Sequence, residues 1–299
     1  MDIVTAIQGL SNDVATLGKD LARVKEFAII RLFSVNDSDL EHFAQGWSKS
    51  FLDADDGLER AEMVAKGFTV DLNKPLVFQV GHLGEAYEEW VHIPIVSKEG
   101  PRFFASDILE FFTKTKWWVV PLVWLPFICW LVSVSLQRGL LPPHAALALA
   151  GGVLIWTLLE YTLHRFLFHM KTRSYWGNTL HYLLHGCHHK HPLDKLRLVF
   201  PPVAAAILSI PVWTTFRLLS TPCVAPALFG GALLGYVMYD CTHYYLHHGK
   251  PSSGATQNLK RYHLNHHFKV QSMGFGITSP LWDKVFRTFP EPKAAERSR

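Results

Sequence analysis

The chain carries little charge and has no cysteine arrangement typical of a scaffold. Only 18% of its 299 residues are charged, and the net charge is +4. No basic stripe is interleaved with aromatic residues, so the sequence gives no indication of nucleic-acid binding. The four cysteines form no CxxC pair, which argues against a disulfide framework. The chain also shows no apolar h-region of a signal peptide and no haem, flavin or glycine-rich dinucleotide motif.

Long apolar runs are present instead, within a hydrophobic fraction of 49%. Four of them are near the length needed to cross a hydrocarbon core about 30 Å thick. Buried core helices are the alternative, but four such runs in succession favour a membrane domain. The sequence therefore predicts an all-α protein with a four-transmembrane-helix integral membrane domain. The runs cover residues 117–136, 144–163, 198–216 and 223–238.

Basic residues outside these runs set the expected orientation. They precede the first run, fill the long loop between the second and third runs, and follow the fourth. The positive-inside rule then places both termini and the long middle loop in the cytosol. The other two connections are short and carry one arginine each, Arg138 and Arg217.

Histidine is the residue that indicates chemistry. Thirteen of the seventeen histidines lie between residues 164 and 267. Spacings of three and four residues put imidazoles on one helical face, and neutral imidazoles are ligands for first-row transition metals. The predicted topology brings all the clusters to the cytosolic ends of the spans. The clusters are HRFLFH (164–169), HYLLHGCHH (181–189, followed by His191), HYYLHH (243–248) and HLNHH (263–267).

The number of imidazoles points to two metal ions. It exceeds the three or four ligands of a single zinc site, so we predict a histidine-rich di-metal site in a cytosolic helical cap. His164 and His169 are five residues apart, and we expect them to flank a helix end and reach different metals. His82 and His92 stand alone in the sequence and are interpreted as non-ligands.

Tyr239 and Asp240, which precede the third cluster, are candidates for a catalytic role. Tyr239 and Asp240 precede His243 by four and three residues, on the same helical face. A carboxylate near the end of a span is costly without a partner, so Asp240 is predicted to accept a hydrogen bond from an imidazole N–H. An interfacial Asp240 facing water is the alternative. Glu160, four residues before His164, invites the same argument.

The four histidine motifs resemble those of the membrane fatty acid hydroxylase superfamily. The similarity is strongest to the plant form of the fatty acid 2-hydroxylases, which act on sphingolipid acyl chains. The flanking segments 68–75, 117–121 and 274–283 agree, and the resemblance covers about residues 63–290. It implies an O2-using enzyme of the endoplasmic reticulum membrane with two metal ions, iron in the active enzyme or zinc in its place. The ligands that it implies are His164, His169, His185, His188, His189, His243, His247, His263, His266 and His267, with His181 and His248 as second choices.

The resemblance also implies a substrate and an electron donor. The expected substrate is the acyl chain of ceramide or dihydroceramide within the membrane lipid. Fungal and animal members of the family carry a fused cytochrome b5 domain with an HPGG haem motif, which this sequence lacks. We therefore expect cytochrome b5 and its NADH-dependent reductase as separate partners, steered by basic residues of the middle loop. These residues are Lys171, Arg173, Lys190, Lys195 and Arg197.

The predicted organisation has four parts. Residues 1–62 form an amphipathic helical extension, 63–116 a cytosolic pre-membrane segment, 117–290 the membrane hydroxylase domain and 291–299 a tail. A related sterol oxidase or acyl desaturase remains the nearest alternative. A divalent-metal transporter would place histidines in the middle of the spans, and a structural zinc protein would show no dependence on O2.

Overall fold

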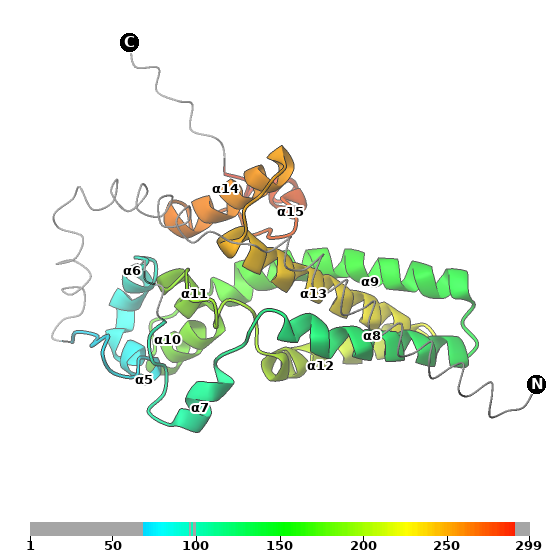
Figure 1. Cartoon of the computed structure of the whole chain (residues 1–299), viewed down its shortest axis with the longest axis horizontal. Coiled ribbons are helices and arrows are strands. Elements are labelled where there is room, and N and C mark those ends of the chain that lie inside the picture. Colours follow the sequence, from blue (N-terminus) through cyan, green and yellow to red (C-terminus); the bar gives the residue numbers. More distant parts are fainter. Residues whose placement is uncertain (1–67, 96, 98–99, 291–299) are drawn as a thin grey trace, which may run out of the picture.

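The computed structural model describes residues 68–95, 97 and 100–290, and its regular structure there is entirely helical. This confirms the all-α prediction. Four long helices form an elongated bundle, and the shorter helices gather at one end of it (Figure 1). The predicted extension 1–62 and tail 291–299 lie outside the described residues. The bundle helices are α8 (Val119–Gln137), α9 (Pro142–Thr162), α12 (Pro202–Leu219) and α13 (Ala225–His248).

Proline and glycine define where these helices begin and end. Proline occupies the first turn of α9, α12 and α13, where its missing N–H costs no hydrogen bond. After α8, Gly139 adopts a φ of 88°, a left-handed conformation that suits glycine at a helix end. The short link from Gly139 to Pro142 makes α8 and α9 an antiparallel pair.

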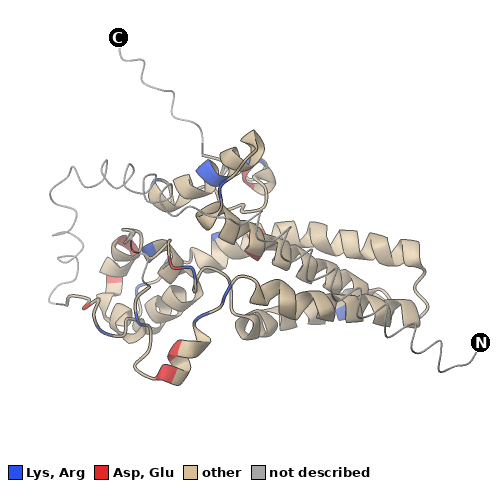
Figure 2. Ribbon diagram, viewed as in Figure 1, with Lys and Arg blue, Asp and Glu red and all other residues tan. Residues whose placement is uncertain are grey.

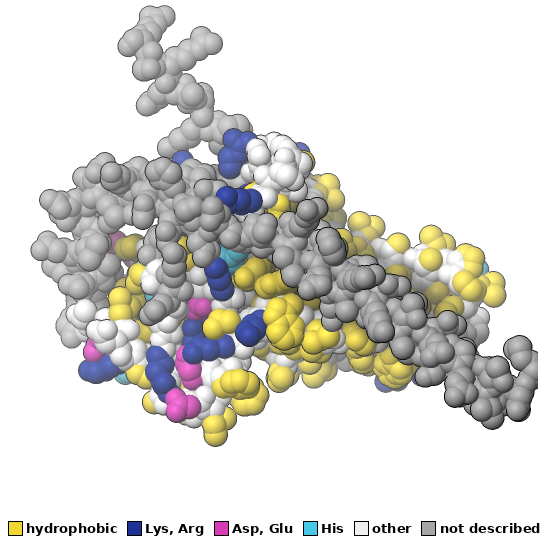
Figure 3. Space-filling view, viewed as in Figure 1, with side chains coloured by type: hydrophobic (Ala, Val, Ile, Leu, Met, Phe, Trp, Pro, Cys, Tyr) yellow, Lys and Arg dark blue, Asp and Glu magenta, His cyan; other side chains and the backbone are white. Residues whose placement is uncertain are grey.

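Three of the described helices are long and apolar enough to cross a membrane. They are the segments Val119–Gln137, Pro142–Phe168 and Pro202–Leu219, with mean hydropathies of 2.2, 1.6 and 1.5. Hydrophobic side chains cover most of the visible bundle surface (Figure 3), and charged residues concentrate around the short helices (Figure 2). The fourth predicted run lies in α13, which carries Asp240 and histidines in its second half.

Helix α13 is the buried centre of the bundle and packs mainly on α9 and α8. Glycine allows its close contact with α9. A Cβ on Gly152 would lie 2.1 Å from the Leu228 carbonyl oxygen, and one on Gly231 would lie 2.0 Å from the Leu149 carbonyl oxygen. No side chain fits at either position, so the two backbones approach closely.

The remaining helices build the cap around the end of the bundle. Segments before α8 and after α9 share a second hydrophobic core, which includes Tyr87, Trp90 and Tyr182. The buried Lys190 ammonium donates to the carbonyl oxygens of Trp90 and Ile93, both at 2.8 Å, and ties the two segments together. The cap elements are α5 (Val77–Val80), η2 (Gly81–Ala86), α6 (Tyr87–Val91), α7 (Asp107–Phe112), η3 (Leu163–Phe168), α10 (Tyr175–His181), η4 (Tyr182–Gly186), α11 (Cys187–Lys190), α14 (Gly254–Phe268) and α15 (Leu281–Val285).

Candidate metal centre

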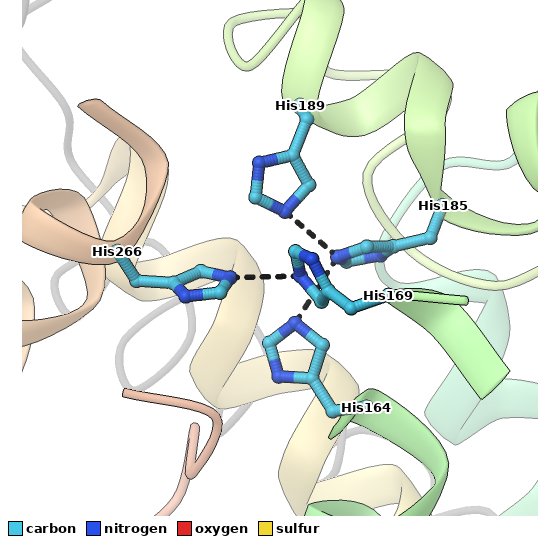
Figure 4. A group of neighbouring side chains, drawn as sticks. All are labelled: His164, His169, His185, His189 and His266. Carbon is cyan, nitrogen blue, oxygen red and sulfur yellow. Dashed lines mark hydrogen bonds between the residues drawn. The ribbon is translucent and has the colours of Figure 1, made fainter. Parts of the chain in front are cut away.

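Ten histidines converge where the bundle meets the cap, and they form two groups of five. In group 1, the ligand atoms lie within 4.8 Å of one another (Figure 4). The Nε2 atom of His185 lies 3.1 Å from that of His164 and 3.0 Å from that of His189. The Nε2 atoms of His169 and His266 lie 3.0 Å apart. Group 1 consists of His164, His169, His185, His189 and His266.

Group 2 is equally compact. Its ligand atoms also lie within 4.8 Å of one another, and the Nε2 atoms of His247 and His263 are 2.7 Å apart. The two groups adjoin, because the rings of His189 and His267 stack with centroids 4.3 Å apart. The structure thus brings together all ten histidines that the resemblance implies as ligands. Group 2 consists of His188, His243, His247, His263 and His267.

Helical spacing explains how one motif serves both groups. On one helical face, a residue four positions on is rotated by about 40° and a residue three positions on by about 60° in the opposite direction. In the second motif, His185 and His189 join group 1 and His188 joins group 2. Helix α14 mirrors this division, since His263 and His267 join group 2 and His266 joins group 1. Each HxxHH motif therefore bridges the two groups.

The prediction that His164 and His169 reach different metals is wrong. Both belong to group 1, with ring centroids 5.0 Å apart. The cause is the π-helix η3, in which the N–H of His169 donates to the carbonyl oxygen of His164, five residues back. The wider turn of a π-helix puts side by side two residues that an α-helix would separate.

The ring nitrogens of the two groups are better suited to binding a metal than to hydrogen-bonding with one another. Those of His243 and His267 are buried and have no hydrogen-bond partner among the described residues, and uncompensated buried polar atoms are rare. Burial lowers the pKa of His185, His188 and His189 well below the usual value, and neighbouring imidazoles lower it further. These rings are therefore neutral, the state that metal binding needs. Donors that are all imidazole suit iron or zinc.

Backbone carbonyls orient two rings of group 1. The Nδ1–H of His164 donates to the Phe275 carbonyl oxygen at 2.5 Å, and the Nδ1–H of His266 donates to that of Met273 at 2.7 Å. Each bond selects the tautomer that leaves the Nε2 lone pair facing the group. The segment 273–279 thus acts as an orienting loop for group 1.

Two buried carboxylates hold this orienting loop. Asp283 accepts the backbone N–H groups of Phe275 and Gly276 at 2.9 and 2.7 Å. Glu160 accepts those of Ile277 and Thr278 at 2.7 and 2.8 Å. The prediction that Glu160 accepts from an imidazole is therefore wrong, because its Oε1 receives these two amides. Asp283 was not predicted, although its place in the 274–283 segment that agrees with the family was a signal.

Asp240 and Tyr239 lie next to group 2, but the direct bond predicted for Asp240 is absent from the described residues. Its Oδ2 accepts the backbone N–H of Phe200 at 3.1 Å, and neither ring nitrogen of His243 has a partner there. Tyr239 lies on the histidine side of α13, with its ring centroid 5.6 Å from that of His243. Both residues are buried and line the cavity described below.

Other histidines surround the groups without joining them. His92, which looks isolated in the sequence, lies against group 1, with ring centroids 5.3 Å from His189 and 5.9 Å from His169. Its Nε2 is buried without a partner among the described residues. His181 bonds the Tyr87 hydroxyl at 2.6 Å, and His248 packs on Tyr244. Nothing in the sequence around His92 signals its position.

The basic face predicted for the middle loop is wrong at two residues. Lys190 and Arg197 are both buried, and Arg197 pairs with Asp194 at 2.7 Å and with Glu110. Lys171, Arg173 and Lys195 are exposed. The structure thus leaves only three of the five predicted residues on the surface.

An apolar cavity of about 310 Å³ runs from the histidines into the bundle. Its polar end reaches His185 of group 1 and both His188 and His243 of group 2. Aliphatic and aromatic side chains of α9, α12 and α13 line most of the remainder, and Arg197 and Thr113 lie on its cap side. The arrangement is suited to a long apolar molecule whose one end meets both histidine groups.

These features define the chain as a member of the fatty acid hydroxylase family, whose pattern matches residues 149–288. It is 65% identical over 235 residues to dihydroceramide fatty acyl 2-hydroxylase FAH2 of Arabidopsis thaliana, covering 79% of this chain and 99% of that protein. It is 64% identical to FAH1 of the same plant over 237 residues, covering 79% and 100%.

A solved structure has the same architecture. It is described as full-length scs7p with only the hydroxylase domain visible, and it is 40% identical with a TM-score of 0.72. The similarity covers 79% of this chain and 94% of that one. The family resemblance seen in the histidine motifs is therefore confirmed along the described part of the chain.

Proposed function

We propose that this protein is an O2-dependent 2-hydroxylase of the fatty acyl chain of ceramide or dihydroceramide. The observation that carries the proposal is the apolar cavity that ends on both histidine groups. High identity to two dihydroceramide fatty acyl 2-hydroxylases over almost their whole length supports the same substrate class. The acyl chain would fill the cavity, with its second carbon at the histidines.

The ten histidines would hold two metal ions, one in each group. We propose iron for the active enzyme, with zinc able to occupy the same imidazole sites. The bound metals would supply the activation of O2 that an unactivated C–H bond requires. The protein's part is to orient the ligands through the carbonyls of Met273 and Phe275 and to exclude water from the apolar cavity. Tyr239 and Asp240, at the cavity wall, would position the acyl carbonyl end.

We propose that α13 is the fourth span and that the cap faces the cytosol in the endoplasmic reticulum membrane. The basic loops support this orientation through the positive-inside rule. The depth of the site supports it too. An amide-linked acyl chain has its second carbon just below the headgroups. The charged side chains concentrate at the cap end of the bundle (Figure 2), and the histidines lie at that end, on or beside the elements η3, η4, α11, α13 and α14.

Electrons would come from cytochrome b5 and its NADH-dependent reductase. Two electrons are needed for each hydroxylation, and the chain has no haem or flavin motif to supply them. The exposed Lys171, Arg173 and Lys195 remain candidates for docking this acidic carrier, joined by Arg261 and Lys269 on and beside α14. Surface charges act mainly on the rate of encounter and are screened by salt.

The function is tested by lipid mass spectrometry of cells with and without the gene. We expect 2-hydroxy acyl chains on ceramides only when the gene is present. Hydroxylation at another carbon, or a new double bond, would point to a different enzyme of the family. A sterol product would do the same.

The electron donor is tested with purified protein. We expect no turnover with NADH and O2 alone, and turnover after cytochrome b5 and its reductase are added. The rate should fall as ionic strength rises. Full turnover without a carrier would contradict the proposed donor while leaving the product assignment intact.

A further inference from the structure

The cavity is bounded by one continuous face of each of two long helices. On α13 it touches every third or fourth residue from Phe229 to His243, and on α12 it follows the same spacing from Pro201 to Val212. This spacing is that of a single helical face. The N–H of Phe200 donates to Asp240, which sets the histidine ends of both faces at the same level. The cavity is therefore a channel that runs along both helices.

The length of this channel follows from helix geometry. Phe229 and His243 are fourteen residues apart, which at about 1.5 Å per residue makes a length of about 21 Å. An extended hydrocarbon chain advances about 1.25 Å per carbon, given a bond of about 1.5 Å and an angle of about 111°. The channel therefore matches about 17 carbons in an extended chain.

Phe229 is the lining residue of α13 that lies farthest from the histidines. Phe229 is buried, and its ring packs on Trp213 of α12 with centroids 5.2 Å apart. Val212 lines the channel just before Trp213 in the sequence. A chain that reaches Phe229 meets its ring, which Trp213 of α12 supports outside the channel. Closely packed rings of this kind cannot yield without loss of contacts.

From this geometry we propose that the channel selects acyl chains of about 16 to 18 carbons, with Phe229 as its end wall. The proposal rests on the 2-hydroxylase function proposed above and adds the chain length to it. Ser209 lies between the histidines and Phe229 along the channel. It lines the channel eight residues along α12 from Pro201. Pro201 follows Phe200, which bonds Asp240, three residues before His243. The eleven residues from the level of His243 to Ser209 correspond to a chain of about 13 carbons.

The test measures 2-hydroxylated product against acyl chain length, from 12 to about 24 carbons, in membranes that contain the full chain, cytochrome b5 and its reductase. Ser209→Phe would obstruct the channel, and we expect the ratio of short-chain to long-chain product to rise about tenfold. Ile210→Phe is its matched control, because Ile210 is the next residue on α12 but is exposed and does not line the channel.

Phe229→Leu would move the end wall outward and should shift the product toward longer chains. We expect the ratio of short-chain to long-chain product to fall about tenfold. Phe127→Leu, on the exposed side of α8, is its control. Opposite shifts from the two variants cannot arise from loss of folding, which would lower all products together. An unchanged profile in Phe229→Leu, or the same direction of shift in both variants, would overturn the proposal. If the unaltered protein yields no 2-hydroxy product at any length, the proposed function itself fails.

Discussion

The two histidine groups have the same number of imidazoles but are held in place by different means. Two rings of group 1 donate to carbonyl oxygens of the orienting loop 273–279. In group 2, the Nδ1 atoms of His247 and His263 and both nitrogens of His267 have no partner among the described residues. Four of the five rings of group 2 lie on α13 and α14. Group 1 therefore depends on a loop, and group 2 on the packing of two helices.

The largest effect is expected from removing one ligand of either group. His189→Ala in group 1 and His247→Ala in group 2 should each abolish hydroxylation, because both groups meet the same end of the cavity. Activity is measured as 2-hydroxy product in membranes. His82→Ala is the control, since His82 is exposed and, within the described part of the chain, its ring contacts those of Phe68 and Tyr175 and no group 1 or group 2 histidine. Retained activity in either ligand variant would show that one group is dispensable.

Asp283→Asn should impair group 1 and leave group 2 intact. An amide can accept only one of the two N–H groups that the carboxylate now receives from Phe275 and Gly276. The orienting loop then shifts, and we expect activity to fall by about 100-fold, near the upper end for changes around metal ligands. Metal analysis should show the loss in group 1 with group 2 retained. Equal loss from both groups would contradict the division described here.

Asp240→Asn should have a smaller effect. Asp240 accepts a backbone N–H at the wall of the cavity and bonds no ring nitrogen directly. We expect about a tenfold loss of activity, at the lower end of the same range, with both metals retained. Metal content and product are measured on one preparation. Loss of metal from group 2 in this variant would instead mean that Asp240 supports His243.

The smallest effect is expected from deleting the N-terminal extension. No predicted ligand lies before residue 63, and the match to the family begins after the extension. A chain starting at Met63 should hydroxylate at the rate of the full chain in the same membranes. A folded but inactive truncation would assign the extension a role in the reaction.

Local spacing predicted the histidine clusters, and the family resemblance implied the ten ligands proposed here, while contacts distant in sequence could not be predicted. The i, i+4 pairs His185/His189 and His263/His267 predict shared sites, because helical geometry alone brings their members together. The π-helix η3 was not foreseen, since its wider turn has no clear sequence signature, and this reversed the interpretation of His164 and His169. The roles of Glu160 and His92 depend on tertiary contacts with residues about 80 to 120 positions away.

Contacts distant in sequence also explain why two basic residues were wrongly predicted to lie on the surface. Lys190 and Arg197 look like surface residues of a basic loop, and most such residues are exposed. Here Lys190 donates hydrogen bonds to two backbone carbonyl oxygens in and beside α6, and Arg197 forms ion pairs with two carboxylates. Asp194 lies three residues from Arg197, but the other partners come from segments that only the folded chain brings near. Charge in the loop therefore did not predict which of its basic residues lie on the surface.

The most direct test of the account is the metal content of purified protein and of one variant in each group. We predict two metal ions per chain in the unaltered protein and one in both His189→Ala and His247→Ala, with His82→Ala retaining two. Crystallographic anomalous scattering from the bound metal should place the remaining ion in group 2 for His189→Ala and in group 1 for His247→Ala. A single ion in the unaltered protein, or two in either ligand variant, would contradict two separate five-histidine sites.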